Sequence, residues 1–398
     1  MRSPTRKAPL LLRLFAAIAL GAVVGLVAGP RCVGLARGSG LFVKLLKLLA
    51  TPLLFAAIVE AVAATRIRVR MGAALLVISL VNALVAAAIA LGTVHLIPVG
   101  RVVDLDAIRR LSGSFSELPS DSFWLTIFDQ VLGALSVNNL LSVIAISFAL
   151  GIALRFSAAT STGRQLIALD RILLRLCIKI LGALVRLVPL AIFGVVASVM
   201  GRGGARLFPV LGAFVALIAV GMSLQMFVYY GLIVKLVVRK SVRRFFTQST
   251  AALSTAMSAG SSMATLPVTL QTLEVEMGVS TEAARLAACI GTNFNHDGII
   301  LYEAATALFV AQAFGIVLGL SAQMKIVVTS IVAAIGIAGV PEAGLITLSL
   351  VLSAAGLPLA AIPLLLPVDW LLGRFRATVN VASDLTVANV LDRMFPGG

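Results

Sequence analysis

The sequence predicts an all-α polytopic membrane protein, and three observations carry that prediction. Hydrophobic residues make up 60% of its 398 positions, charged residues only 12%, and the mean hydropathy is +1.09. Apolar runs long enough to cross a bilayer, which takes about 20 residues, follow one another along the chain. Basic residues gather between these runs, in every second loop. Such a composition leaves no room for a soluble domain.

The placement of the basic residues decides what the net charge of +16 means. In a soluble chain this charge would favour nucleic acid as a partner. Here the clusters precede the first apolar run and follow the second, fourth and sixth, which is the positive-inside pattern of cytoplasmic loops. We therefore expect a multi-pass protein of the plasma (inner) membrane, in contact with lipid, with both termini in the cytoplasm and no nucleic-acid partner.

We expect the first six spans at about 10–29, 41–65, 72–98, 124–155, 168–201 and 208–238. The first apolar run follows a short basic segment, as a signal peptide would. It is long and more spans follow, so we interpret it as an uncleaved first helix. By organisation the chain divides into residues 1–72 with the first two helices, 73–240 with helices three to six, and 241–398 as a transport core.

Two segments in the last third predict re-entrant hairpins. Residues 248–272 and 322–355 each hold two short apolar arms around a tip of small residues, SAGSSMATLP and AAIGIAGVPEAG. Irregular backbone at membrane depth is tolerated only where it lines a cavity; the alternative is two spans kinked by Gly and Pro. A helix with polar residues follows each hairpin, and the hairpins should enter from opposite sides. Inverted repeats of this kind are typical of secondary transporters.

The helix expected after the second hairpin carries a polar face. Positions 369, 373, 376, 380 and 384 fall within an arc of roughly 80° at 100° per residue, and four of them are Asp369, Arg376, Asn380 and Asp384. Charged groups in hydrocarbon indicate by default an ion or substrate path, although a structural Asp/Arg pair at a helix seam is the alternative. A second polar run, GTNFNHDG, lies at 291–298.

The acidic residues that lie among other polar groups at membrane depth are Asp297, Asp369 and Asp384. Carboxylate and amide oxygens suit a hard cation such as Na⁺, whereas the chain has no cluster of His or Cys typical of a transition metal. His296 interrupts the second polar run. Either proton transfer or simple packing would explain a histidine there.

Four motifs in this order resemble the sodium:dicarboxylate symporters, the family of glutamate/aspartate, neutral amino-acid and C4-dicarboxylate transporters. They are TLPVT, GTNFNHDGIILYEA, GIAGVPEAG and DWLLGRFRATVNVASD, and the resemblance extends over essentially the whole chain. It implies eight transmembrane helices plus two re-entrant hairpins, a homotrimer, an elevator-type movement of the transport core, and no bound cofactor.

The resemblance also implies a substrate site. Arg376 matches the arginine that pairs with a distal carboxylate of the substrate, and Asp369 matches the residue that steadies it. Asn380 matches the amide that holds the other carboxylate, with the backbone at Ser262, Gly339 and Val340 closing over it from the two tips. Arg374 matches an arginine that other members carry in the first hairpin, at the position of Gly260 here.

For transported cations, the resemblance implies two groups of ligands. Asp384 with the carbonyls near Gly291, Asn295 and Asn380 matches one sodium site. Asn295 with Asp297 matches a deeper one, with Asn293 in the same segment and Asn82 of the third span as a further ligand. Val81 and Ile78 leave the third-span ligands of the deeper site few.

One departure from the family pattern bears on the substrate. Amino-acid transporters of this family carry an aspartate one turn before the arginine to receive an ammonium group, and this chain has Gly373. A buried ammonium without a carboxylate partner costs several kcal/mol, so Gly373 favours an amine-free dianion. Three other departures stand at Ile299, His296 and Met263.

We therefore expect a sodium-coupled symporter of small anionic substrates, either a C4-dicarboxylate or an acidic amino acid. A proton-coupled carrier is the first alternative. A passive anion channel and a membrane-embedded enzyme are alternatives of other classes. The sequence contains no nucleophile, metal cluster or cofactor motif that would favour an enzyme.

Overall fold

The computed structural model describes residues 10–64, 69–102, 140–202, 204–291, 294–336 and 344–396, and every regular element in these ranges is a helix. The predicted all-α class is therefore confirmed for the described chain. The α-helices are α1 Leu10–Ala28, α2 Ala36–Ala64, α3 Val69–Leu96, α6 Leu140–Ser157, α7 Ser161–Val185, α8 Val188–Gly201, α9 Leu207–Ser223, α10 Tyr230–Ile233, α11 Val242–Ala259, α12 Ser262–Gln271, α13 Thr281–Arg285, α14 Asp297–Ala313, α15 Leu320–Gly336, α16 Gly344–Ala354 and α17 Ala361–Met394.

Several expected spans coincide with helices. The expected spans at 10–29, 41–65 and 72–98 correspond to α1, α2 and α3, and the span at 208–238 corresponds to α9 and α10, joined and extended by π-helical turns at Leu224–Tyr229 and Val234–Val238. Within the described ranges, three helical runs are long and apolar enough to cross a membrane: Leu12–Cys32, Arg70–Arg101 and Leu207–Val238. Of the expected span 124–155, the part before residue 140 lies outside the described residues.

The span expected at 168–201 is not one straight helix. It is α7 and α8, bent by 43° at a break between them. Pro189 lies in the first turn of α8, where its missing N–H costs nothing but where its ring prevents the preceding helix from continuing. Counted as one bent span, this pair is a fourth candidate crossing.

Both expected hairpins have a helix in each arm. In the first, Gly260 ends α11 in the left-handed conformation (φ +65°), and the Ser261 hydroxyl then caps α12 by accepting from the Ala264 N–H. Glycine adopts this conformation without steric cost, and serine is a preferred N-cap, so the tip sequence explains the turn. In the second hairpin α15 packs on α16. Its tip at 337–343, with Gly339 and Val340, lies outside the described residues.

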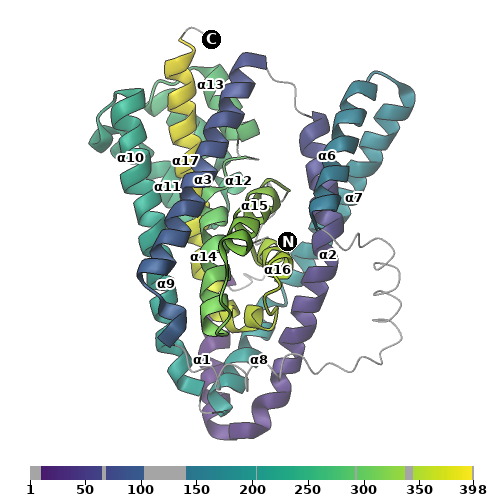
Figure 1. The fold of residues 1–398 in the computed structure, drawn as a ribbon, viewed down its shortest axis with the longest axis vertical. Coiled ribbons are helices and arrows are strands. Elements are labelled where there is room, and N and C mark those ends of the chain that lie inside the picture. Colours follow the sequence, from purple (N-terminus) through teal and green to yellow (C-terminus); the bar gives the residue numbers. More distant parts are fainter. Residues whose placement is uncertain are drawn as a thin grey trace, which may run out of the picture.

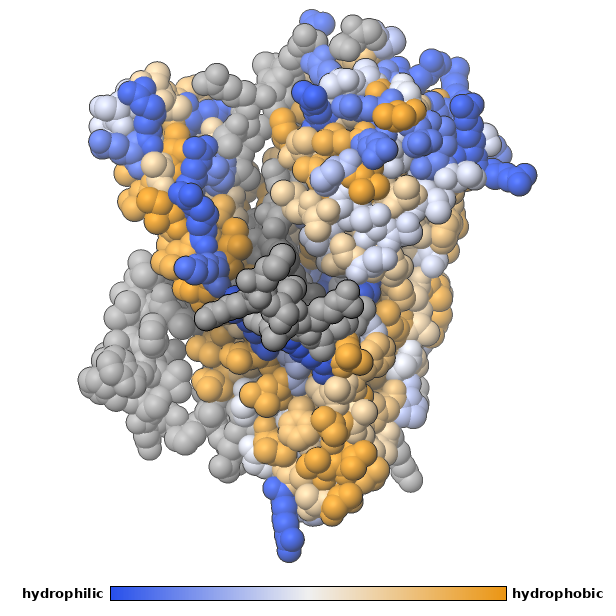
Figure 2. Space-filling model, turned by 180° about the vertical axis from the view of Figure 1, so that it is seen from behind, coloured by the Kyte–Doolittle hydropathy of each residue, from blue (hydrophilic) through white to orange (hydrophobic). Residues whose placement is uncertain are grey.

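The helices form two connected bodies (Figure 1). On one side α6 and α7 pack on α2. On the other, α3, α9 and α17 pack on α14, and α10 and α11 pack on α17. The second hairpin lies between them, and both its arms contact α2. Hydrophilic side chains gather at the end that holds the C-terminus (Figure 2).

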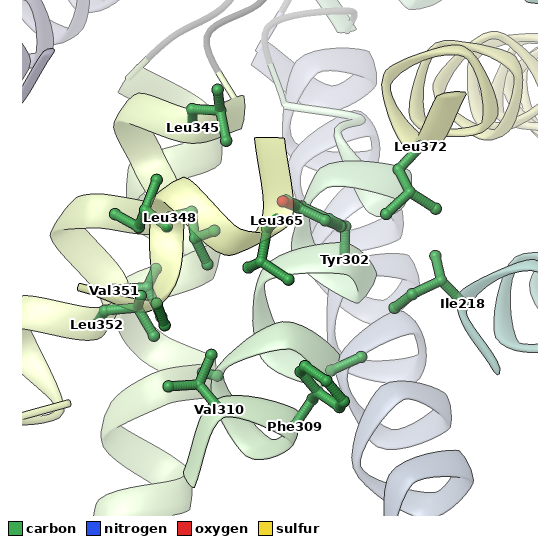
Figure 3. Packing of buried hydrophobic residues seen from close by; sticks show 14 of the residues in the cluster. Ile218, Tyr302, Phe309, Val310, Leu345, Leu348, Val351, Leu352, Leu365 and Leu372 are labelled. Atoms are coloured by element: carbon green, nitrogen blue, oxygen red, sulfur yellow. The ribbon is translucent and has the colours of Figure 1, made fainter. Parts of the chain in front are cut away.

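Apolar packing between α14, α16 and α17 forms the centre of the larger body. Figure 3 shows leucine and valine side chains of α16 facing α14, with side chains of α17 and α9 alongside. The labelled residues are Ile218, Tyr302, Phe309, Val310, Leu345, Leu348, Val351, Leu352, Leu365 and Leu372.

A polar contact near the C-terminal end of α17 holds the first hairpin. The Lys240 ammonium donates to Asn389 Oδ1 (2.8 Å) and thereby ties the start of the first hairpin to α17.

Small residues bring α1 and α8 into close contact. A Cβ added to Gly25 would lie 2.5 Å from the Ala197 carbonyl oxygen and 2.7 Å from Met200 Cβ, and one added to Gly21 would lie 2.9 Å from the Phe193 carbonyl oxygen. Glycines at such spacing allow helix backbones to approach in a membrane, where van der Waals contact replaces the hydrophobic effect between helices. The contact therefore depends on the absence of a side chain.

We expect Gly25→Ala to lower the free energy of unfolding by about 1–3 kcal/mol, because the added methyl group overlaps backbone that cannot give way. Thermal unfolding of the purified protein in detergent measures the loss. Gly92→Ala on α3 is the matched control, since nothing lies within 4 Å of the added Cβ, and it should stabilise by roughly 0.5–1 kcal/mol. Equal stability of the two variants would contradict this packing.

Candidate functional site

The polar face expected near the C-terminus lies on one continuous helix. Asp369, Arg376, Asn380 and Asp384 are all on α17 and all buried. α17 packs on α14, whose first residue is Asp297. The helix expected after the first hairpin is broken between Ile290 and Asp297, and this break brings its polar residues against the polar face of α17.

Arg376 is held from three sides. Its guanidinium donates from Nη1 to Asp369 Oδ1 (2.7 Å) and from Nη2 to Asp369 Oδ2 (3.4 Å). It also lies over the Tyr302 ring, 4.2 Å from the centroid. A Cβ on Gly344, the first residue of α16, would lie 2.7 Å from the guanidinium carbon. The charge is thus fixed where α14, α17 and the second hairpin meet, in the fork geometry that suits a carboxylate.

Asn380 joins the two helices that carry the site. Its Oδ1 accepts a hydrogen bond from the Gly298 N–H at the start of α14 (2.9 Å). Gly298 has no room for a side chain, because a Cβ there would lie 2.5 Å from the Arg376 carbonyl oxygen. Close backbone approach and one amide therefore fix the start of α14 beside Arg376.

The first expected group of cation ligands lies one turn further along α17. Asn295 Nδ2 donates to Asp384 Oδ1 (3.1 Å), and the Ser79 hydroxyl of α3 donates to Asn295 Oδ1 (2.5 Å). The Gly291 carbonyl oxygen accepts from the N–H groups of Phe294 (2.6 Å) and Asn295 (2.7 Å), which closes the turn. The Asp384 carboxylate therefore faces the amide nitrogen of Asn295, while the amide oxygen of Asn295 faces the Ser79 hydroxyl. Asn293 lies outside the described residues.

The deeper expected group centres on Asp297, which is fully buried. Its Oδ2 accepts from the hydroxyl groups of Tyr230 (2.5 Å) and Ser383 (2.8 Å). Asn82 of α3 is also present, and its Oδ1 accepts from the Tyr229 hydroxyl (2.8 Å). Tyr230 of α10 and Ser383 of α17 thus bond to this carboxylate directly, and Asn82 is linked to it through Ser383 (Asn82 Nδ2 to Ser383 Oγ, 3.5 Å).

Three expected substrate residues lie at the edge of this arrangement. Gly373 is on the same face of α17 and half-buried. Arg374 turns away from Arg376: its Nη1 donates to the Trp370 carbonyl oxygen (2.7 Å), and its guanidinium lies 5.4 Å from the centre of the Trp370 ring. A Cβ on Gly260 would lie 3.7 Å from Arg374 Cγ, so this side chain reaches the first hairpin tip, where Ser262 begins α12.

The sequence reasoning missed Glu303 and the tyrosines. Glu303 is fully buried on α14, beside Ser330 of α15, Thr347 of α16 and Arg376. Its signal was a carboxylate six residues after Asp297 in an otherwise apolar run. The sequence does not distinguish Tyr229, Tyr230 and Tyr302 from ordinary residues of membrane helices. Only their contacts in the structure do so. Within the described ranges, no group of three or more His, Cys, Asp or Glu side chains could hold a metal ion.

Residues 10–394 match the sodium:dicarboxylate symporter family. The chain belongs to this family. The family that the four motifs indicated is therefore confirmed.

The sodium:dicarboxylate symporter family includes relatives with which this chain shares long stretches. It is 40% identical to human excitatory amino acid transporter 3 over 189 residues, 48% of this chain and 36% of that protein. It is 38% identical to human excitatory amino acid transporter 2 over 181 residues, 46% and 32% of the two chains. A putative sodium-dependent excitatory amino acid transporter, glt-4, of Caenorhabditis elegans is 32% identical over 259 residues, 64% and 51%. The chain thus spans about a third to a half of the length of these relatives.

We expect Gly344→Ala to weaken substrate binding about tenfold or more, because the new Cβ would displace the Arg376 guanidinium by a distance that oriented contacts do not tolerate. Equilibrium binding to the purified protein measures this loss. Gly319→Ala, which precedes α15 and has open space around it, is the matched control and should bind as the wild type does. Wild-type affinity in Gly344→Ala would show that Arg376 is not held as described.

Proposed function

We propose that this chain is a secondary active symporter that couples the uptake of a small anionic substrate to sodium. The observation that supports it most strongly is Arg376, a buried guanidinium placed between α14, α17 and the second hairpin. A buried, fixed cation among apolar helices is a binding group for a carboxylate. The substrate class is a C4-dicarboxylate or an acidic amino acid, and the protein acts by transport rather than by catalysis.

In this proposal Arg376 binds one carboxylate of the substrate, and Asp369 orients the guanidinium. Asn380 binds the other carboxylate, together with the backbone of the two hairpin tips at Ser262 and at Gly339 and Val340. Sodium binds at Asp384 and Asn295, with carbonyl oxygens near Gly291 and Asn380. Asn380 and Asp384 are one helical turn apart on α17, so ion and substrate order the same turn and each favours binding of the other.

The same proposal includes the architecture implied by the family: a homotrimer in which residues 241–398 move as an elevator-type transport core. In this proposal the two hairpins close over the substrate in turn, which gives alternating access. A passive anion channel would need a continuous path instead. Uptake against a concentration gradient distinguishes the carrier from the channel.

A proton-coupled carrier is the second candidate, and Glu303 is the observation that favours it. This carboxyl group is fully buried and lies beside both arms of the second hairpin. Ionisable groups at membrane depth are costly, and where they occur they mark ion or proton paths. If protons are coupled here, replacing Glu303 by glutamine should remove the dependence of uptake on a pH gradient and leave substrate binding in place.

The experiment that tests the function is uptake into proteoliposomes of succinate, malate, aspartate, glutamate and a neutral amino acid, each with and without an inward sodium gradient. We expect concentrative, sodium-dependent uptake of at least one dianion. Arg376→Ala should lose that uptake by about 100-fold or more, since removal of one partner of a buried charge contact costs 3–5 kcal/mol. Uptake by Arg376→Ala at the wild-type rate would refute the proposed carboxylate site.

The second test concerns the choice between the two substrate classes. We expect Gly373→Asp to raise affinity for aspartate or glutamate and to lower it for succinate, because the new carboxylate pairs with an ammonium group and repels a bare dianion. Competition binding at two pH values measures both effects. Arg374→Gln combined with Gly373→Asp is the control for pairing between the introduced aspartate and Arg374. Tight glutamate binding by the unmodified protein, without succinate binding, would contradict this role of Gly373.

A further inference from the structure

The exposed side of α7 carries a stripe of basic residues. Arg164, Arg171, Arg175 and Lys179 are all exposed, and at about 100° per residue they fall within an arc of roughly 80°. They span roughly 23 Å along the helix axis. Figure 2 shows hydrophilic side chains in a column along the body that holds α6 and α7. We call these four residues the α7 basic stripe.

The carboxylates near this stripe do not neutralise it. Glu60 of α2 pairs with Arg171 (2.9 Å), and Asp170 is buried on the packed side of α7. Arg164 Nη1 and Arg175 Nε donate to backbone carbonyl oxygens of their own segment, at 2.9 and 3.2 Å. Among the described residues, no acidic side chain lies within ion-pair distance of the other three members of the stripe. Three positive charges therefore face the surroundings of α7.

A second exposed face of α7, next to the basic stripe, is apolar. Leu169, Ile172, Leu176 and Ile180 are between 43% and 62% exposed, and they fall within an adjacent arc of roughly 80°. The third side of the helix packs on α2 and α6. One helix thus presents a positive face and an apolar face side by side, as amphipathic helices do at a membrane surface.

The length of this segment places the stripe at the level of the lipid headgroups. α7 and α8 have 25 and 14 residues and together extend about 58 Å, whereas the hydrocarbon core of a bilayer is about 30 Å thick. α8 with the last turn of α7 is long enough to cross the core, so the stripe lies beyond it. α7 begins at the end of the molecule that holds the C-terminus (Figure 1), which the positive-inside pattern assigns to the cytoplasm.

A lipid with an anionic headgroup fits both exposed faces of α7. Its phosphate pairs with basic side chains, and its acyl chains pack on the apolar face beside them. A free phosphate ion would leave the apolar face uncovered.

A second copy of this chain fits less well, because like charges that face each other at an interface repel. A partner surface would need acidic side chains. Apart from Glu60, the acidic residues of the described ranges that are not buried all belong to the other body, after α12: Glu274, Glu276, Glu282 and Asp392.

We propose that the α7 basic stripe binds anionic phospholipid of the cytoplasmic leaflet, with phosphate groups on Arg175 and Lys179 and acyl chains along Leu176 and Ile180. Bound lipid then fixes the level of α2, α6 and α7 in the membrane. The stripe lies outside residues 241–398, so this inference does not depend on the substrate and ion sites proposed above.

The test compares two lipids on the purified, detergent-solubilised protein. Phosphatidylglycerol and phosphatidylcholine with the same acyl chains are titrated, and thermal stabilisation is measured, since a ligand of the folded state raises stability by mass action. We expect phosphatidylglycerol alone to stabilise the wild type, and added salt to weaken the effect by screening. Arg175→Gln combined with Lys179→Gln should raise the half-saturating phosphatidylglycerol concentration about 30-fold, since each basic residue near an anionic surface contributes a factor of about five.

Two matched variants make the result specific. Arg243→Gln combined with Arg244→Gln removes two exposed cations at the start of α11 and should respond to phosphatidylglycerol as the wild type does. Arg175→Lys combined with Lys179→Arg keeps both charges of the stripe and should do the same.

Three results would overturn the inference. The first is equal weakening in the two double glutamine variants, which would show a response to net charge alone. The second is equal stabilisation of the wild type by inorganic phosphate, which would show a site for a free anion. The third is a change of molar mass in light scattering of the Arg175→Gln, Lys179→Gln variant with an unchanged lipid response, which would show an interface between copies of the chain.

Discussion

The packing of α14, α16 and α17 around the candidate site depends on the ion pair between Arg376 and Asp369. Both side chains are almost completely buried, and the paired atoms are 2.7 Å apart. Two charges taken out of water cost several kcal/mol each, and their attraction repays this only with close geometry and further contacts. The surroundings supply those contacts: the Tyr302 ring lies over the guanidinium, Gly344 allows backbone to approach the guanidinium, and Gly298 allows α14 to approach the backbone of Arg376. Glycine at 344 thus leaves room for the buried charge, and glycine at 298 leaves room for the backbone that carries it.

A second constraint follows from the break before α14. In a continuous helix the side chains of Asn295 and Asp297 would point in different directions. The irregular segment before α14 instead lets Asn295 bond to Asp384 and Asp297 bond to Ser383. Both partners are on α17, as is Asn380, which bonds to the Gly298 N–H. One irregular segment is therefore fastened to three neighbouring positions of one regular helix. An ion or substrate that binds to any one of these residues therefore affects the positions of the others.

Periodicity in the sequence was sufficient to predict much of the fold and of the candidate site. The polar face of α17 followed from residues spaced at three and four positions, and the first hairpin followed from SAGSSM, where a left-handed glycine ends one helix and a serine caps the next. Local rules decide both features, because each depends on residues that are neighbours along the chain. The break between α7 and α8 was missed for the opposite reason: the apolar pattern continues across it, and only Pro189 marks the bend.

The tyrosines show where sequence reasoning stops. Tyr229 contacts Asn82 across 147 positions, and Asn82 points to Ser383 across 301. No periodicity within α9 or α10 distinguishes a tyrosine that contacts another helix from one that faces lipid. The π-helical turn at Leu224–Tyr229 adds a further displacement, since an extra residue in one turn changes the direction of every side chain near it. The hydrogen bonds that the Asp297 carboxylate accepts are thus decided by residues that its own motif, GTNFNHDGIILYEA, does not contain.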